Sequence, residues 1–184
     1  VRARFNALNT CSSTGDNFVF LFNASSIVGG DGGDTLKGGA GADIITGGGA
    51  DDTIVGGGAI DTITGGAGDD IITGGAGNDI ITVDSGTDTV TDLGGAAGNE
   101  SDVVVIASGA TLNATGIKGF TATTATQNNS TNATKAVLTA ADGSNVTISV
   151  ASATGSSKAF KLVGGTGQDT LTGGAGNDII LGNN

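Results

Sequence analysis

Aspartates recur at a fixed spacing through the first half of this 184-residue sequence. Each lies in a glycine-rich stretch and is followed two positions later by Leu, Ile or Val. Glycines allow positive φ and a close approach of the backbone to a ligand, so such a turn presents carbonyl oxygens beside the carboxylate. An oxygen-only donor set suits a hard cation of the calcium type rather than zinc or copper. The seven aspartates, nine positions apart, are Asp34, Asp43, Asp52, Asp61, Asp70, Asp79 and Asp88.

The same pattern returns near the C-terminal end. It reads GGTGQDTLT from Gly164 and GGAGNDIIL from Gly173, which adds Asp169 and Asp178 to the candidate ligands. Regular recurrence of both the acidic and the apolar position argues against a flexible low-complexity linker, which has no reason to keep either. The glycine pairs that open the first six blocks begin at Gly29, Gly38, Gly47, Gly56, Gly65 and Gly74.

Three blocks depart from the pattern. Ala50 and Ala59 stand at the fourth position, where most blocks have glycine, and Val83-Asp84 replaces the glycine pair of the block that holds Asp88. We expect cation sites that use these turns to be weakened, above all the one at Asp88.

The aspartates require a scaffold that repeats with them. We expect each block to hold six residues of turn and three of strand, such as Thr62-Ile63-Thr64, whose middle side chain faces inward. Because one strand cannot bury its isoleucine alone, blocks must stack, two to a coil, around a thin apolar core. Blocks one, three, five and seven then share one parallel sheet, and blocks two, four and six share the other. Cations held between successive turns would number about four or five in the first array.

Composition narrows the function classes. The chain has 36 glycines, a net charge of −11, one cysteine and no histidine. Without histidine, Ser-His-Asp and HExxH centres are impossible, and the Asp51-Asp52 carboxylate pair falls in a cation turn, so we predict no enzyme activity. Cys11 alone makes neither a disulfide framework nor a thiolate metal site. The negative charge disfavours nucleic acid, and no apolar run approaches the ~20 residues of a membrane span.

The block G-G-x-G-x-D-x-U-x resembles the calcium-binding nonapeptide of RTX proteins, over Gly29 to Thr91 and Gly164 to Asn184. The resemblance implies an all-β fold, a right-handed parallel β-roll with a β-rich insert between two repeat blocks. It also implies calcium as the cofactor and the aspartates above as its side-chain ligands. Backbone oxygens would come from the carbonyls of Gly29, Asp31, Gly38, Gly47, Gly56, Gly65, Gly74, Gly164 and Gly173.

We divide the chain into a leader or cap (1–28), a β-roll (29–93), a β-rich Ala/Thr/Ser/Asn module (94–163) and a second repeat block (164–184). The run from Phe18 to Phe22 is expected to be a strand that caps the first coil. The segment from Asp102 to Phe120 resembles those that follow nonapeptide arrays in large bacterial surface and secreted RTX proteins. Continuation of the solenoid through the middle module and packing of that module beside it are both open.

The leading hypothesis is a calcium-binding bacterial structural protein, secreted through a type I channel to the cell surface or exterior. It would self-assemble into a surface layer (S-layer), matrix or filament through its array ends, as a homo-oligomer or polymer, and a cell-surface polysaccharide is a further candidate partner. The alternative is a calcium-stiffened spacer of a secreted adhesin or exoprotein. A third hypothesis, an ice-binding array of outward threonines, is weakened by Lys37, Ile44, Val55 and Ile80, which interrupt it.

Overall fold

The computed structural model describes residues 8–10, 15, 18–94, 100–123, 125–130, 136–143, 145–155 and 159–183. Every regular element in these residues is a β-strand, and every strand pair is parallel. The strands are β1 Leu8–Thr10, β2 Phe18–Phe20, β3 Ser26–Gly30, β4 Thr35–Gly39, β5 Ile44–Gly49, β6 Thr53–Gly58, β7 Thr62–Ala67, β8 Ile71–Ala76, β9 Ile80–Val83, β10 Thr87–Val90, β11 Val103–Ile106, β12 Thr111–Ile117, β13 Phe120–Thr121, β14 Gln127–Asn128, β15 Ala136–Ala140, β16 Thr147–Ser149, β17 Lys161–Val163, β18 Thr170–Thr172 and β19 Ile179–Leu181.

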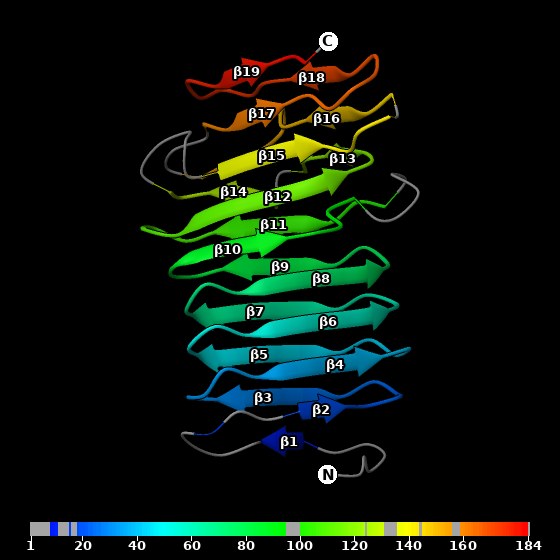
Figure 1. The fold of residues 1–184 in the computed structure, drawn as a ribbon, viewed down its shortest axis with the longest axis vertical. Coiled ribbons are helices and arrows are strands. Elements are labelled where there is room, and N and C mark those ends of the chain that lie inside the picture. The colour runs from blue at the N-terminus through cyan, green and yellow to red at the C-terminus, as the bar shows by residue number, and fades with distance from the viewer. Residues whose placement is uncertain are drawn as a thin grey trace.

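Two long sheets make up most of the molecule. One has seven strands in the order β1-β3-β5-β7-β9-β11-β14, and the other has nine in the order β19-β17-β15-β12-β10-β8-β6-β4-β2. Figure 1 shows strands of the two sheets alternating along the long axis and pointing in opposite directions, with the termini at opposite ends. Blocks one, three, five and seven supply β4, β6, β8 and β10, so the predicted alternation of blocks between two sheets is confirmed.

Strands in the regular coils are longer than predicted. From β5 to β8 each has six residues and includes the glycine pair, which leaves three residues of turn rather than six. Gly48 and Gly66 pair across β5 and β7 although their φ values are 128° and 111°. A Cβ at Gly48 would overlap the carbonyl oxygen of Gly30 in the coil below, so the ladder can close over these positions only with glycine.

The core between the sheets is one side chain deep from each side. In each three-residue strand that the sequence predicted, the third residue is partly exposed, whereas the middle residue is fully buried. Ile45, Ile63 and Ile81 from one sheet face Leu36 and Ile54 from the other, all with no exposed area. Burying an isoleucine contributes about 1.5–3 kcal/mol, so stability here accumulates coil by coil.

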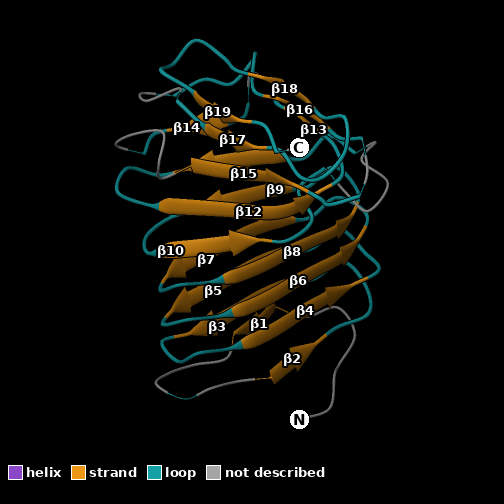
Figure 2. Ribbon diagram, turned by 45° about the horizontal axis from the view of Figure 1, so that its top comes forward, coloured by secondary structure: helices purple, strands orange, loops and turns teal. Residues whose placement is uncertain are grey.

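The middle segment continues the stack. β11 pairs with β9, and β12 pairs with β10. Both sheets therefore continue into a segment after residue 94 that lacks the nonapeptide. The step from Ile80 to its partner Val103 is 23 residues, compared with 18 from Thr62 to Ile80. Figure 2 shows β13, β16 and β18, which form a third, three-stranded sheet, grouped beside the upper end of the stack. The question that the sequence left open is therefore answered in favour of a continued solenoid.

The leader places β2 at one end of the nine-stranded sheet, next to β4. Its core-facing residues are Val19 and Leu21, while Phe18 and Phe22 are 71% and 57% exposed. On the outer side, the ring centroids of Phe20 and Phe22 are 4.8 Å apart, edge to face, and Lys37 Nζ lies 5.1 Å from the Phe20 ring centroid. This end position is compatible with the predicted cap, but the phenylalanines do not face the core. Cys11 lies outside the described residues.

Candidate cation-binding turns

The aspartates of alternate blocks form two buried columns, one along each edge of the roll. In the first column, the backbone N–H of each aspartate donates to Oδ1 of the aspartate 18 residues later, at 2.7 to 3.0 Å, through Asp34, Asp52, Asp70 and Asp88. In the second, the same bonds run at 2.8 Å through Asp43, Asp61 and Asp79. Each of these seven residues is at most 2% exposed. The predicted side-chain ligands of the first array are thus brought together as a ladder.

The second carboxylate oxygen, Oδ2, has an unusual environment. Within the part of the chain that the structure describes, buried Oδ2 atoms lack a hydrogen-bond partner at Asp52, Asp61, Asp70, Asp79 and Asp88. In every one of these blocks except that of Asp88, which begins with Val83, the first glycine lies against this oxygen. A Cβ at Gly47 would overlap both Asp52 Oδ2 and the carbonyl oxygen of Gly65, one coil further on.

Buried carboxylate oxygens without partners are costly, so something positive is required beside them. A carboxylate oxygen and a carbonyl oxygen from the next coil converge at Gly29, Gly38, Gly47 and Gly56. This pair of oxygens is a donor set for a hard cation. The residues present therefore fit calcium, and bound calcium would supply the missing positive charge.

Carboxylate burial also shifts the acidity of these groups. Desolvation, with added repulsion from Asp70 and Asp34, raises the pKa of Asp52 to about 6. Desolvation and the charges of Asp79 and Asp43 raise the pKa of Asp61 to about 7. The columns therefore hold negative charge at neutral pH only against a strong electrostatic penalty.

Comparison with protein families matches the RTX calcium-binding nonapeptide repeat (4 copies) at residues 28–63, 55–90 and 161–184. These ranges contain the stacked aspartate turns and the parallel strands that follow them. The chain contains RTX calcium-binding nonapeptide repeats. Its Asp-rich turns are of the kind that bind Ca²⁺, and its architecture is the parallel β-roll. No curated protein and no solved structure matches the chain.

The RTX ladder extends beyond the predicted aspartates to Asp102. Asp102 Oδ1 accepts from the N–H of Asp79 at 2.8 Å, in the place of a further repeat aspartate, and Oδ2 accepts from Gly94 N–H at 2.6 Å. Sequence analysis missed this residue because it lies 23 positions after Asp79. Its signal was nevertheless present, since Asp102-Val103-Val104 repeats the Asp-x-apolar order of the nonapeptide.

Two further acids gather at the end of the first RTX array. Asp92 accepts from the N–H groups of Gly74 at 2.9 Å and Gly75 at 2.7 Å, so its side chain takes the place of a neighbouring strand. Besides burial, the charges of Asp92 and Glu100 raise the pKa of Asp79. The last turn on this edge consequently holds more carboxylate groups than the regular turns.

In the regular coils, exposed acidic residues form a further column along one edge of the roll and not along the other. Asp51 Oδ1 accepts from Asp69 N–H at 2.8 Å, and Asp69 Oδ1 accepts from Thr87 N–H at 2.7 Å. Corresponding positions on the opposite edge hold Ala42, Ile60 and Asn78. The two edges of the RTX roll thus differ in charge although their buried columns are alike.

The irregular turns keep their backbone course. Ala50 and Ala59 adopt φ of 63° and 69°, in the left-handed region that glycine would otherwise supply. Asp88 has no exposed area, and its Oδ1 accepts from Asp70 N–H. Burial, with repulsion from neighbouring acids, raises its pKa to about 7. Weaker cation binding at these turns stays a prediction, but the geometry of the ladder does not break there.

The C-terminal repeat aspartates do not join an aspartate ladder. Asp169 Oδ1 accepts from Val146 N–H at 3.0 Å, and Asp178 Oδ1 accepts from Phe160 N–H at 2.8 Å. Asp178 Oδ2 also accepts from Gly174 N–H at 2.7 Å. Each therefore stacks on a residue without a carboxylate, unlike the aspartates of the first array.

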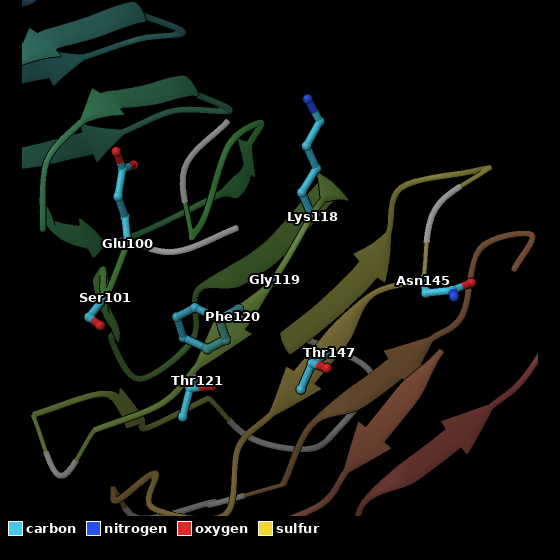
Figure 3. Close-up of a pocket in the computed structure, with 8 residues that line it drawn as sticks. All are labelled: Glu100, Ser101, Lys118, Gly119, Phe120, Thr121, Asn145 and Thr147. Atoms are coloured by element: carbon cyan, nitrogen blue, oxygen red, sulfur yellow. The ribbon is translucent and has the colours of Figure 1, made fainter. Parts of the chain in front are cut away.

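An open pocket of about 400 Å³ lies beside β13 and β16. Figure 3 shows Glu100 and Lys118 extending toward the same side of it, away from Phe120, Thr121 and Thr147. Hydroxyl and amide groups line the rest, and the chain has no histidine to activate a nucleophile. Among the described residues no helix is long and apolar enough to cross a membrane.

Proposed function

We propose that this chain is an extracellular structural module that folds when calcium enters the turns between successive coils. The observation that supports it is the pair of buried aspartate columns, in which Oδ2 of Asp52, Asp61, Asp70 and Asp79 lies unpartnered against the first glycine of its block. The proposed ligands are the carboxylates of Asp34, Asp43, Asp52, Asp61, Asp70, Asp79, Asp88, Asp169 and Asp178, with Asp102 added, and the carbonyls of Gly29, Asp31, Gly38, Gly47, Gly56, Gly65, Gly74, Gly164 and Gly173.

Each Asp-to-Asp hydrogen bond marks one interval between successive coils in which a cation would sit. Five connect the seven predicted aspartates, and the bond to Asp102 makes six. The expectation of about four or five ions in the first array becomes a proposal of five or six. Five divalent ions would offset almost all of the net charge of −11, and six would exceed it by one charge.

Repulsion between the carboxylates makes folding depend on calcium. In the unfolded chain the aspartates stay hydrated and apart, whereas the roll stacks them in columns within the protein interior. Ligands that meet only in the folded state convert binding free energy into folding free energy. Extracellular calcium modules commonly work at roughly 10⁻⁴ to 10⁻³ M, which suits a chain that stays unfolded inside a cell and folds outside.

Export through a type I channel and residence at the cell surface or exterior follow from this proposal. Self-assembly in a surface layer, matrix or filament is its further part, and a cell-surface polysaccharide is a candidate partner. The alternative is a stiff spacer in an adhesin or exoprotein. Catalysis is not part of either proposal. A spacer stays monomeric with calcium, whereas an assembly subunit does not.

The test is a calcium titration of chelator-treated protein, followed by far-ultraviolet circular dichroism and by calorimetry for stoichiometry. The proposal predicts strand signal rising with the binding of five or six ions. Magnesium at equal concentration is the control, because it prefers rigid octahedral sites with retained water. Full strand signal in chelator at neutral pH would refute calcium-conditional folding.

A further inference from the structure

The outer face of the seven-stranded sheet differs from the rest of the surface in its charge. The chain has 18 acidic and 7 basic residues, yet no charged residue occurs among the described outward positions of this sheet. We call it the seven-stranded face. Its members are Ser26, Val28, Ile44, Thr46, Thr62, Thr64, Ile80, Thr82, Val103, Val105 and Gln127.

Large and small side chains alternate along this face. In one row, Ile44 pairs with Thr62 and Thr62 pairs with Ile80, so a threonine separates two isoleucines. Ile44 is 58% exposed and Ile80 is 40% exposed, which is unusual for isoleucine in the absence of a partner. Facing sheets pack by interdigitating such side chains at about 10 Å separation.

We propose that two copies of this chain associate face to face through the seven-stranded face. The proposal rests on the calcium-dependent folding proposed above, because the face exists only in the folded roll. A two-fold arrangement shifted by one strand, about 4.8 Å, places Ile44 of one copy opposite Thr62 of the other and Ile80 opposite Ser26. The row is thus complementary to itself.

Area and charge both favour a second copy as the occupant. Six strands at about 4.8 Å, with four to five residues of about 3.3 Å each, give on the order of 430 Å² per copy. Two such faces bury about 860 Å², which is close to the lower limit of a specific contact. A chain with 18 acidic and 7 basic residues brings the fewest like charges together when two copies meet through an uncharged surface.

Neither the acidic edge nor the other sheet offers the same surface. The acidic edge carries the exposed carboxylates of Asp51 and Asp69, which would repel a second copy. The nine-stranded sheet carries Lys37 and Lys161 at outward positions. These charges would lie opposite uncharged groups or each other in a face-to-face pair.

A matched pair of lysine substitutions tests the contact. Thr62 and Thr53 are both exposed and both open a six-residue strand, β7 and β6, in opposite sheets. With saturating calcium, Thr62→Lys should raise the dimer dissociation constant by roughly 100-fold or more, because each copy brings an uncompensated charge into the contact beside the two-fold. Thr53→Lys should dimerise like the wild type. Sedimentation equilibrium measures association, and circular dichroism checks folding in the same samples.

The outcomes separate this proposal from calcium-dependent folding. A wild type that shows calcium-induced strand signal but stays monomeric overturns the face contact and leaves the folding proposal intact. Association of Thr62→Lys equal to that of the wild type also overturns it, since the contact must then lie elsewhere, such as at the array ends. If Thr62→Lys changes the dichroism spectrum, Thr64→Lys, on the same strand and face, replaces it as the decisive variant.

Discussion

Asp79 donates its backbone N–H to Oδ1 of Asp102, which lies 23 residues later in the chain. The bond has the length and direction of those that connect aspartates 18 residues apart. A loop of different length thus delivers a carboxylate to the same point of the column.

Asp102→Asn should remove one cation and keep the hydrogen bond from Asp79 N–H, because the amide oxygen still accepts it. The bond from Gly94 N–H is lost, because the amide nitrogen cannot accept. Calorimetry should show one ion fewer than in the wild type, and the calcium midpoint of folding should rise. Asp142→Asn is the control, since Asp142 is outside both columns and binds Thr166 N–H at the surface. Unchanged stoichiometry in Asp102→Asn would show that this carboxylate is only structural.

Gly47→Ala should disrupt cation binding directly. Its Cβ would overlap Asp52 Oδ2 and the carbonyl oxygen of Gly65, so the turn must move. Gly49→Ala, two positions later, is the control because the nearest atom to its Cβ would be Asp31 Cα at 3.5 Å. We expect Gly47→Ala to raise the calcium midpoint at least about tenfold, or to prevent folding, by analogy with the 1–3 kcal/mol cost of overpacking. Equal midpoints for both variants would contradict the site geometry.

Ile63→Ala should lower the free energy of unfolding in saturating calcium by about 2–5 kcal/mol, since Ile63 is fully buried between the sheets. Thr62→Ala changes an exposed neighbour on the same strand and should cost less than about 1 kcal/mol. Urea unfolding measures both. A loss below about 1 kcal/mol at Ile63 would mean that calcium alone, and not the core, holds the coil.

Acid should partly replace calcium. Burial and neighbouring carboxylates raise the pKa of Asp52 to about 6 and those of Asp61 and Asp88 to about 7, against about 3.9 for an unperturbed aspartate. Between about pH 4 and 7 the cation-free roll therefore binds more protons than the unfolded chain, so its stability falls as pH rises. In chelator, circular dichroism should show more strand at about pH 5 than at pH 8. The opposite order would contradict the burial of these groups.

The repeat array could be predicted because packing between coils requires its nine-residue period. An inward isoleucine such as Ile63 must recur once per half-coil, and glycine must recur where backbones of successive coils meet. Those two demands leave a signal in every block, so the sheets, the alternation and the aspartate columns follow from sequence. The six-residue strands did not, because the extension depends on contacts between coils at Gly48 and Gly66 rather than on residues within one block.

The middle of the solenoid left no such signal. Its coils are held by Val104, Leu112 and Ala114, which are ordinary strand residues without glycine pairs or aspartates between them. Loops of unequal length then shift the register, so Asp102 fell outside the nine-residue frame. The leader was predicted as a strand, but its outward phenylalanines were not, because the alternation of Phe and aliphatic residues fits either orientation until β4 fixes it.

The 18-residue step between stacked strands also sets the length of the molecule. Eighteen residues of extended chain reach about 60 Å, whereas each coil lengthens the roll by about 4.8 Å. Folding therefore shortens the chain roughly twelvefold along its axis, one coil at a time. A protein tethered at both ends of such a roll would be drawn in as the aspartate columns fill, and a pulling force would oppose calcium.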